Sequence, residues 1–296
     1  METHRNRAEG WKYAKLSGHE NEELVKELFS DTGNFQTQFL KRIGKSNCSI
    51  EGVDVGGLKE KNVQSILGGT TKSKTDLKIT LSDGTLLKIS IKKSLAGQVY
   101  LIPINHFIEG YELQYHEIIP DDVKRAISLY WGSAEDTMEI IDNYGTFKPY
   151  EKHKHRAVAD TILAYNPDLY KKLLDWFKLH TYQLFDFCFS KGLAKNEEDW
   201  ANVVWYINKL GENSTDELFL INDLAKYFAE EAHDETFYGN VNGGSTIQLA
   251  FGFVQWHSPT KVIPGCIQFH HQFKIDKEIK EKLKRKIAKK LLVIFL

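Results

Sequence analysis

Residues 68–94 read GGTTKSKTDLKITLSDGTLLKISIKKS, and an Asp-Gly dipeptide in this stretch separates two segments of alternating apolar and polar residues. That pattern is typical of a β-hairpin with a tight turn. A three-residue loop over 82–84 pairs Leu77 with Ile89 and gathers the apolar side chains on one face, whereas a two-residue turn mixes the faces. The sequence therefore predicts the three-residue loop, with Gly84 in the left-handed conformation.

The opposite face of this hairpin carries polar and charged side chains. Asp76 is expected directly across from Ser90, with Lys92 two residues further along on the same side. A carboxylate, a hydroxyl and an amine that converge in this way suit metal-assisted hydrolysis of a phosphodiester. Asp76 and the backbone carbonyl of Ile91 would hold Mg²⁺, and Lys92 would activate the attacking water or offset charge on the phosphate. The residues alone leave open a second interpretation, a polar hairpin face that simply meets solvent.

The order of motifs in this stretch resembles an active-site segment of the PD-(D/E)xK nuclease superfamily. In particular, the Gly-Gly, the Lys-Thr-Asp and the Ser-x-Lys-Lys-Ser look like the corresponding segment of type II restriction endonucleases of the MspI kind. The resemblance implies that Asp76 is the metal carboxylate and Lys92 the catalytic lysine, with Mg²⁺ as cofactor. Two positions depart from the pattern: Ser90 stands where the superfamily usually has Glu, and Thr75 replaces the Pro before the Asp.

The same resemblance implies a fold, an activity and partners. The expected fold is α/β (α+β), a PD-(D/E)xK nuclease core with a central mixed sheet flanked by helices and a large helical insertion in the middle. The expected activity is sequence-specific, Mg²⁺-dependent hydrolysis of double-stranded DNA that leaves 5′-phosphates, with a companion DNA methyltransferase. The alternatives are another PD-(D/E)xK nuclease, of repair or mismatch type, and a non-catalytic DNA-binding regulator. The predicted DNA contacts beside the hairpin are Lys72, Ser73, Lys74, Lys93 and Ser94.

A helix near the N-terminus adds one more acidic candidate. SGHENEELVKELF begins with a capping-box pattern and continues with one apolar face. It resembles the early helix that, in these enzymes, often sends a Glu to the metal site. Glu22 is the predicted residue, with Glu23 as an alternative. A solvated glutamate that stabilises the helix start through the helix dipole is an equally simple interpretation.

A late segment, GFVQWHSPTKVIPGCIQFHHQF, resembles the DNA-contacting segment of such enzymes. Its side chains suit base edges: Gln255 and Gln268 can bond adenine in a bidentate manner, and His257 and His270 can donate to guanine. Lys261 can reach a phosphate. The competing interpretation is a β-hairpin with buried aromatic residues and incidental histidines.

The coarse organisation is that of a single nuclease domain over 1–296. It divides into a catalytic core at 1–118 with the hairpin at 74–93, a helical region at 119–236, and a strand-rich, DNA-contacting segment with a final helix at 237–296. Helical spacing and plausible caps predict helices within 120–132, 133–145, 168–189, 197–210 and 215–232, and a last helix from Ile275 to about Lys290.

Composition and charge bound the class of protein. The 296 residues include three widely spaced cysteines and no Cys-x-x-Cys pair. We therefore expect no disulfide framework, and we expect the protein to reside in a reducing cytoplasm. No apolar run approaches the length of a membrane span. The net charge of −1 hides a basic stretch at 274–290, with nine basic and three acidic residues, and an acidic stretch at 195–235. Such segregation suits a polyanionic partner, bound by a monomer or a homodimer.

Overall fold

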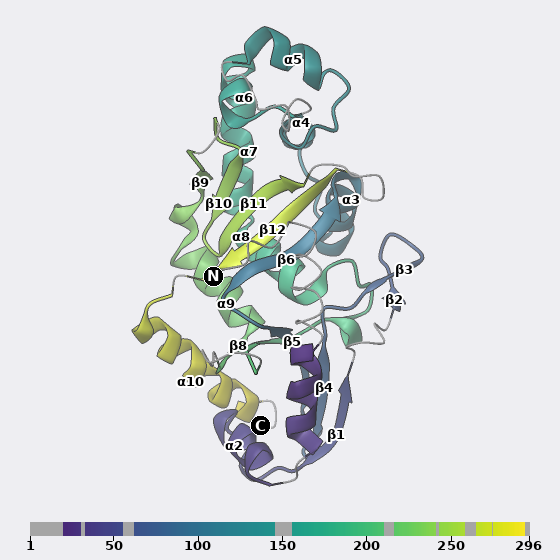
Figure 1. Cartoon of the computed structure of the whole chain (residues 1–296), viewed down its shortest axis with the longest axis vertical. Helices are drawn as coiled ribbons and strands as arrows, with labels where there is room; N and C mark the ends of the chain where they lie inside the picture. Colours follow the sequence, from purple (N-terminus) through teal and green to yellow (C-terminus); the bar gives the residue numbers. More distant parts are fainter. Residues whose placement is uncertain are drawn as a thin grey trace, which may run out of the picture.

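The computed structural model describes residues 20–30, 33–55, 62–145, 156–209, 216–240, 243–257, 265–273 and 275–293. Within these residues the chain forms two five-stranded sheets and one two-stranded β-arm. The sheets follow one another along the long axis of the molecule, with helices around both (Figure 1). The fold is therefore mixed α+β, as the sequence predicts.

The first sheet is mixed. Its order is β1 (Ile50–Val55), β4 (Leu77–Leu81), β5 (Leu86–Lys92), β7 (Val203–Ile207) and β8 (Asp216–Leu220). β5 and β7 run parallel, and every other neighbouring pair is antiparallel. The predicted hairpin, β4–β5, therefore lies in the middle of this sheet.

The predicted hairpin register is confirmed. Leu77 pairs with Ile89, and the amide of Leu81 donates to the carbonyl of Thr85 across the three-residue loop. Gly84 has a φ of 81°, the left-handed conformation that the loop requires. The apolar side chains of both strands, such as Ile79 and Ile89, are buried on one face, which leaves the face with Asp76 for polar groups.

Two predicted helices within the 119–236 region are wrong. The segment 197–210 forms a short 3-10 turn and then strand β7, and the segment 215–232 begins as strand β8 before helix α9. The physical reason is burial on both faces. On one face of β7, Val203, Trp205 and Ile207 belong to the smaller core between the first sheet and its helices. On the other face, Val204 and Tyr206 belong to the larger core that includes the second sheet. A strand buried on both sides is a continuous apolar run, which periodicity cannot distinguish from a buried helix.

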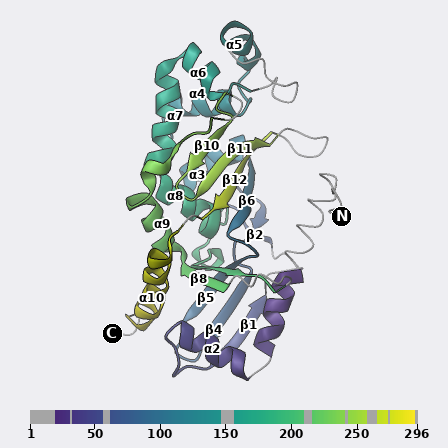
Figure 2. The ribbon, with the colours of Figure 1, turned by 60° about the vertical axis from the view of Figure 1, so that its left-hand side comes forward.

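The second sheet is antiparallel throughout. Its order is β6 (Ala96–Pro103), β12 (Cys266–Gln272), β11 (Gly252–His257), β10 (Thr246–Leu249) and β9 (Phe237–Tyr238). The predicted change to strands near residue 237 is thus confirmed. β6 follows the β4–β5 hairpin almost directly and carries the chain from the first sheet to the second (Figure 2). The β-arm consists of β2 (Asn62–Gln64) and β3 (Thr70–Lys72).

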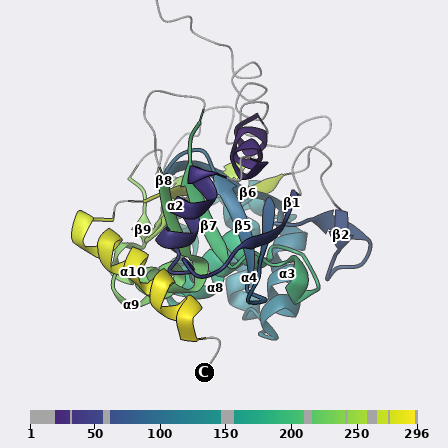
Figure 3. The same cartoon turned by 90° about the horizontal axis from the view of Figure 1, so that it is seen from below.

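The helices cover both sheets. The first sheet is covered by the helix at 20–30, by α2 and by α10 (Figure 3). These helices pack on it through residues such as Phe29, Phe39 and Ile287. Most of the other helices share the larger core with the second sheet. The labelled helices are α2 (Asn34–Arg42), α3 (Ile104–Tyr115), α4 (Asp121–Tyr130), α5 (Thr137–Tyr144), α6 (Ala159–Tyr165), α7 (Pro167–Leu179), α8 (Thr181–Asp186), η2 (Phe187–Lys191, a π-helix), η3 (Glu197–Asp199), α9 (Ile221–Glu230), η4 (His233–Glu235) and α10 (Lys277–Val293).

The final helix, α10, agrees with the predicted helix near 275–290 to within a few residues. Searched over its described residues, the chain has no helix that is both long enough and apolar enough to cross a membrane.

Candidate functional site

The hairpin brings together the carboxylate, the hydroxyl and the amine that its register predicts. Asp76 lies just before β4, where its amide donates to the carbonyl of Ile89 at 2.8 Å. One carboxylate oxygen of Asp76 accepts a hydrogen bond from the amide of Ile91 at 2.7 Å and lies 3.5 Å from the hydroxyl of Ser90. The neighbouring strand thus fixes the carboxylate through its backbone as well as its side chain.

The ammonium group of Lys92 lies among three oxygen atoms of this cluster. It donates to the Ser90 hydroxyl at 2.7 Å and to the Ile91 carbonyl at 3.0 Å, and it lies 3.8 Å from the Asp76 carboxylate. The side chains of Lys92 and Asp76 are 22% and 24% exposed, so a substrate can still reach both. The oxygens of Asp76 and Ile91 already surround a cation here, and carboxylate and carbonyl oxygens are the donors that Mg²⁺ prefers. The residues at this site fit a hard divalent cation.

The electrostatics of the site favour a bound cation. Burial raises the pKa of the Asp76 carboxyl above its usual range, and the Lys92 ammonium and the Ile91 amide oppose that rise. A partly desolvated carboxylate is costly without positive charge beside it. Additional positive charge at Asp76 would therefore stabilise its ionised form.

Lys74 lies beside this cluster but does not extend freely into solvent. Its ammonium sits over the ring of Tyr100 at 3.3 Å from the centroid, a cation–π contact. The Lys74 side chain also packs closely against Gly192, the residue after the π-helix, since a Cβ added at Gly192 would lie only 2.9 Å from it. Burial lowers the pKa of Lys74 to about 7. Tyr100 and Gly192 therefore hold this predicted phosphate contact close to Asp76 and Lys92.

The remaining residues predicted beside the hairpin occupy different settings. The Ser73 hydroxyl donates to the carbonyl of Asp199 at 2.7 Å, and the Ser94 hydroxyl donates to the carbonyl of Ala96, so both hydroxyls already donate to the backbone. Lys72 is exposed at the end of the β-arm, and Lys93 is half-buried just after β5.

The helix at 20–30 begins near the end of the first sheet at which Lys92 lies. The side chain of Asn21 donates to the carbonyl of Ile207 at 2.8 Å and accepts from the amide of Lys209. Lys92 pairs with Tyr206 on the adjacent strand. Glu22 follows Asn21 and is half-buried, whereas Glu23 is exposed. The structure thus places Glu22 at the same end of the sheet as Lys92, and its role as a metal ligand stays a prediction. Over the described ranges, no three His, Cys, Asp or Glu side chains form a metal-binding group.

Three of the predicted base-contacting residues lie together on the exposed face of the second sheet. Gln255 and Gln268 face one another across β11 and β12 and are hydrogen-bonded, and His270 contacts Gln255. His257 lies two residues after Gln255 at the end of β11 and pairs with Cys266. Lys261 lies outside the described residues. Gln98 on β6 joins the same cluster although it is not among the predicted residues. Its alternating, strand-like surroundings are the only sequence signal that points to it.

Tyr206 and His271 connect the buried face of the second sheet to the first sheet. His271 is buried, and its Nδ1 lies 3.2 Å from the hydroxyl of Tyr206, the residue that pairs with Lys92. Burial lowers the pKa of His271 to about 3, so its ring is neutral at physiological pH. His270, the adjacent residue, points to the opposite face and stacks on Phe253. The two sheets therefore meet beside β5, where Tyr206 on β7 pairs with Lys92 and contacts His271.

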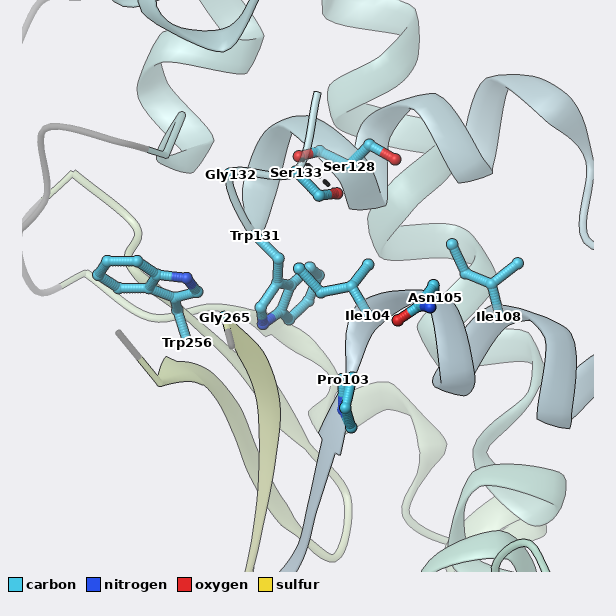
Figure 4. A pocket seen from close by; sticks show the side chains of 10 residues that line it. All are labelled: Pro103, Ile104, Asn105, Ile108, Ser128, Trp131, Gly132, Ser133, Trp256 and Gly265. Carbon is cyan, nitrogen blue, oxygen red and sulfur yellow. Dashed lines mark hydrogen bonds between the residues drawn. The ribbon is translucent and has the colours of Figure 1, made fainter. Parts of the chain in front are cut away.

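A separate cavity of about 480 Å³ lies at the other end of β6. Figure 4 shows Trp131, Trp256 and Ile104 around it, with Asn105 and two serines at one side. Its lining contains none of the residues predicted from the sequence for catalysis or DNA contact.

No protein-family model matches the sequence, and no curated protein matches it. Among solved structures, the chain is similar to the restriction endonuclease MspI in complex with its cognate DNA. The two chains are 13% identical, the alignment covers 87% of each, and the TM-score is 0.45.

Proposed function

We propose that this protein is a Mg²⁺-dependent type II restriction endonuclease that cuts double-stranded DNA at a short specific sequence. One observation carries the proposal: the ammonium of Lys92 lies among the oxygens of Ser90, Ile91 and Asp76. A polar surface strand pair has no structural need for a half-buried carboxylate beside an ammonium, because desolvating both groups is costly. Phosphodiester hydrolysis does need such a pair.

The chain's own residues supply distinct parts of the reaction. The Lys92 ammonium, next to the reacting phosphate, offsets the negative charge that develops when water attacks phosphorus and the bond to the 3′ oxygen breaks. The products are a 3′-hydroxyl and a 5′-phosphate. Ser90 holds Lys92 in place through its 2.7 Å hydrogen bond. The hydroxyl is thus a positioning group at the position where the superfamily usually has a carboxylate.

Asp76 and the carbonyl of Ile91 would hold Mg²⁺ in this proposal, with Glu22 as a further candidate ligand from the helix at 20–30. When bound, Mg²⁺ lowers the pKa of a water molecule and neutralises charge on the phosphate. The fit rests on the hard oxygen donors and on the half-buried Asp76 carboxylate, whose ionised form needs positive charge nearby.

The surroundings of the site favour DNA as the substrate over a small phosphoester. Lys74 lies beside the cluster, Lys93 follows Lys92 in the chain, and Lys72 is exposed on the β-arm, so basic side chains are available beyond a single phosphate. A face of glutamine and histidine side chains on the adjacent sheet offers directional donors and acceptors for base edges. These two features support the proposal of sequence-specific cleavage. A companion methyltransferase that spares host DNA is part of the same proposal.

The test is incubation of supercoiled plasmid DNA with the purified protein, with and without Mg²⁺. Discrete fragments that appear only with Mg²⁺ support a restriction endonuclease. Nicking or a smear indicates a nuclease of repair type instead. A mobility shift without any cleavage indicates a DNA-binding regulator and contradicts the proposal.

A further inference from the structure

A row of hydrogen-bonded side chains crosses three strands on the exposed face of the second sheet. Gln255 on β11 donates to the carbonyl oxygen of Gln268 on β12 at 2.8 Å, and Gln268 donates to the carbonyl oxygen of Gln98 on β6. The amide of Gln255 also lies 3.2 Å from Nε2 of His270, which stacks on Phe253. We call Gln98, Gln268, Gln255 and His270 the amide row.

The amides of the row follow one donor–acceptor order, in which turning over any single amide would break a hydrogen bond. Gln255 uses both of its N–H groups, one toward Gln268 and one toward Nε2 of His270, so that ring nitrogen accepts. Gln268 in turn donates to Gln98. Turning the amide of Gln98 over would place two NH₂ groups against each other. The row therefore holds Gln98 with its carbonyl oxygen toward Gln268.

The end of the row keeps hydrogen-bonding capacity. Within the part of the chain that the structure describes, the NH₂ group of Gln98 has no hydrogen-bond acceptor, and its carbonyl oxygen accepts one bond of the two it can accept. The Gln98 side chain is exposed. Gln98 can thus donate one hydrogen bond and accept another at once, whereas Gln255 has only its carbonyl oxygen left.

We propose that Gln98 is a specificity residue that recognises adenine in the DNA site, an inference that rests on the proposed nuclease function. In the major groove, adenine presents the N7 acceptor beside the N6 amino donor, and a glutamine amide pairs with both. Gln268 has the same spare capacity as Gln98, but it is half-buried between two partners whereas Gln98 is exposed, so Gln255 and Gln268 orient Gln98 instead of each binding an adenine of its own. The recognition sequence must then contain at least one A·T pair.

The position of Gln98 suits this role. It follows Lys92 by only six residues, so the Cα atoms of Gln98 and Lys92 lie within about 22 Å of each other, a span of at most about six base pairs. A β-bulge interrupts the pairing of β6 with β12 beside it, and Gly97 has a φ of 154°. Bulges next to active sites commonly re-aim a side chain.

The test begins with the recognition sequence, read by sequencing the ends of DNA cut by the wild-type protein. Each adenine in that sequence is then replaced, one at a time, by 7-deazaadenine, which lacks the N7 acceptor but keeps the amino group. Binding is measured in Ca²⁺. For wild type, one replacement is expected to weaken binding by about tenfold. Gln98→Ala should bind the natural and the substituted duplex equally well, and Gln248→Ala, on the same face but outside the row, should behave like wild type.

The outcomes separate the two proposals. A protein that cuts DNA at a site of G·C pairs alone, or whose binding no adenine replacement weakens, keeps the nuclease function and overturns the role of Gln98. A tenfold sensitivity that persists in Gln98→Ala also overturns it, because another residue then reads N7. A wild-type protein that cuts no DNA with Mg²⁺ removes both proposals.

Discussion

The ammonium of Lys92 and the hydroxyl of Ser90 are 2.7 Å apart, and that hydroxyl lies 3.5 Å from the carboxylate of Asp76. Ser90 therefore stands between the two charged groups of the site and contacts both. A hydroxyl is a weak ligand for Mg²⁺ compared with a carboxylate, so we assign Ser90 to positioning Lys92.

Ser90→Ala should slow cleavage by roughly ten- to a hundredfold, the range expected for one lost hydrogen bond to a charged group. Asp76→Ala should be far more damaging under the same conditions. Single-turnover cleavage with saturating Mg²⁺ measures both. Equal loss of activity in the two variants would show that Ser90 contacts the metal or the substrate directly. Ser90→Glu introduces a carboxylate beside Asp76 and should change which divalent cations support cleavage.

Asp76→Asn should abolish cleavage and keep specific DNA binding. The substitution preserves the size of the side chain but removes the charge that would hold Mg²⁺, while affinity for DNA comes mainly from phosphate and base contacts. The measurement pairs cleavage in Mg²⁺ with binding to the cognate duplex. Binding lost together with cleavage would mean that Asp76 maintains the fold of the hairpin and is not a metal ligand.

Lys72→Ala should weaken binding to cognate and mismatched DNA alike and lower the slope of log affinity against log salt by about one. Lys72 is exposed on the β-arm, where it would contact a phosphate and carry no sequence information. Binding to both duplexes across a salt series checks this. Lys171→Ala, an exposed lysine on α7, serves as the control, and an equal effect of the two variants would argue against a DNA contact by the β-arm.

Asp83→Ala should destabilise the fold by roughly 1–3 kcal/mol without touching the catalytic groups. Asp83 in the hairpin loop pairs with Lys45 at 2.7 Å, and the Lys45 side chain is only 5% exposed. The Lys45 hydrogen bond holds the pKa of Asp83 well below its usual range. This stabilisation is present above the ordinary carboxyl pKa near 3.8 and is lost as the pH falls toward the lowered value. Urea unfolding at pH 7 and below pH 3.8 measures it, with Asp142→Ala on α5 as an exposed control. A destabilisation that stayed the same at both pH values would contradict the ion pair.

The sequence predicts the parts of the site that local pattern determines. Alternating apolar residues around Asp83-Gly84 admit only one register with a clean apolar face, and that register places Asp76 opposite Ser90. Strand β7 was not predictable in this way, because its five residues are buried on both sides and show no period. Local pattern therefore identifies the hairpin but not its partner strand.

Long-range pairing decides the rest of the site. Gln98 meets Gln268 across 170 residues of chain, through a pairing of β6 with β12 that no local signal specifies. The position of the Lys74 side chain likewise depends on Tyr100 and on Gly192, which come from different parts of the chain. The sequence thus identifies the candidate residues. Only the tertiary contacts show which of their polar groups keep free hydrogen-bonding capacity.

Lys92 gives the most direct test of the proposed chemistry. The decisive measurement is single-turnover cleavage of plasmid DNA in Mg²⁺ by wild type and by Lys92→Ala, with binding to the same DNA measured in Ca²⁺. We predict discrete cleavage by wild type, a loss of at least about a hundredfold in Lys92→Ala, and nearly unchanged binding. Cleavage by Lys92→Ala at a rate close to that of wild type would contradict the assignment of the Asp76, Ser90 and Lys92 cluster as the catalytic site.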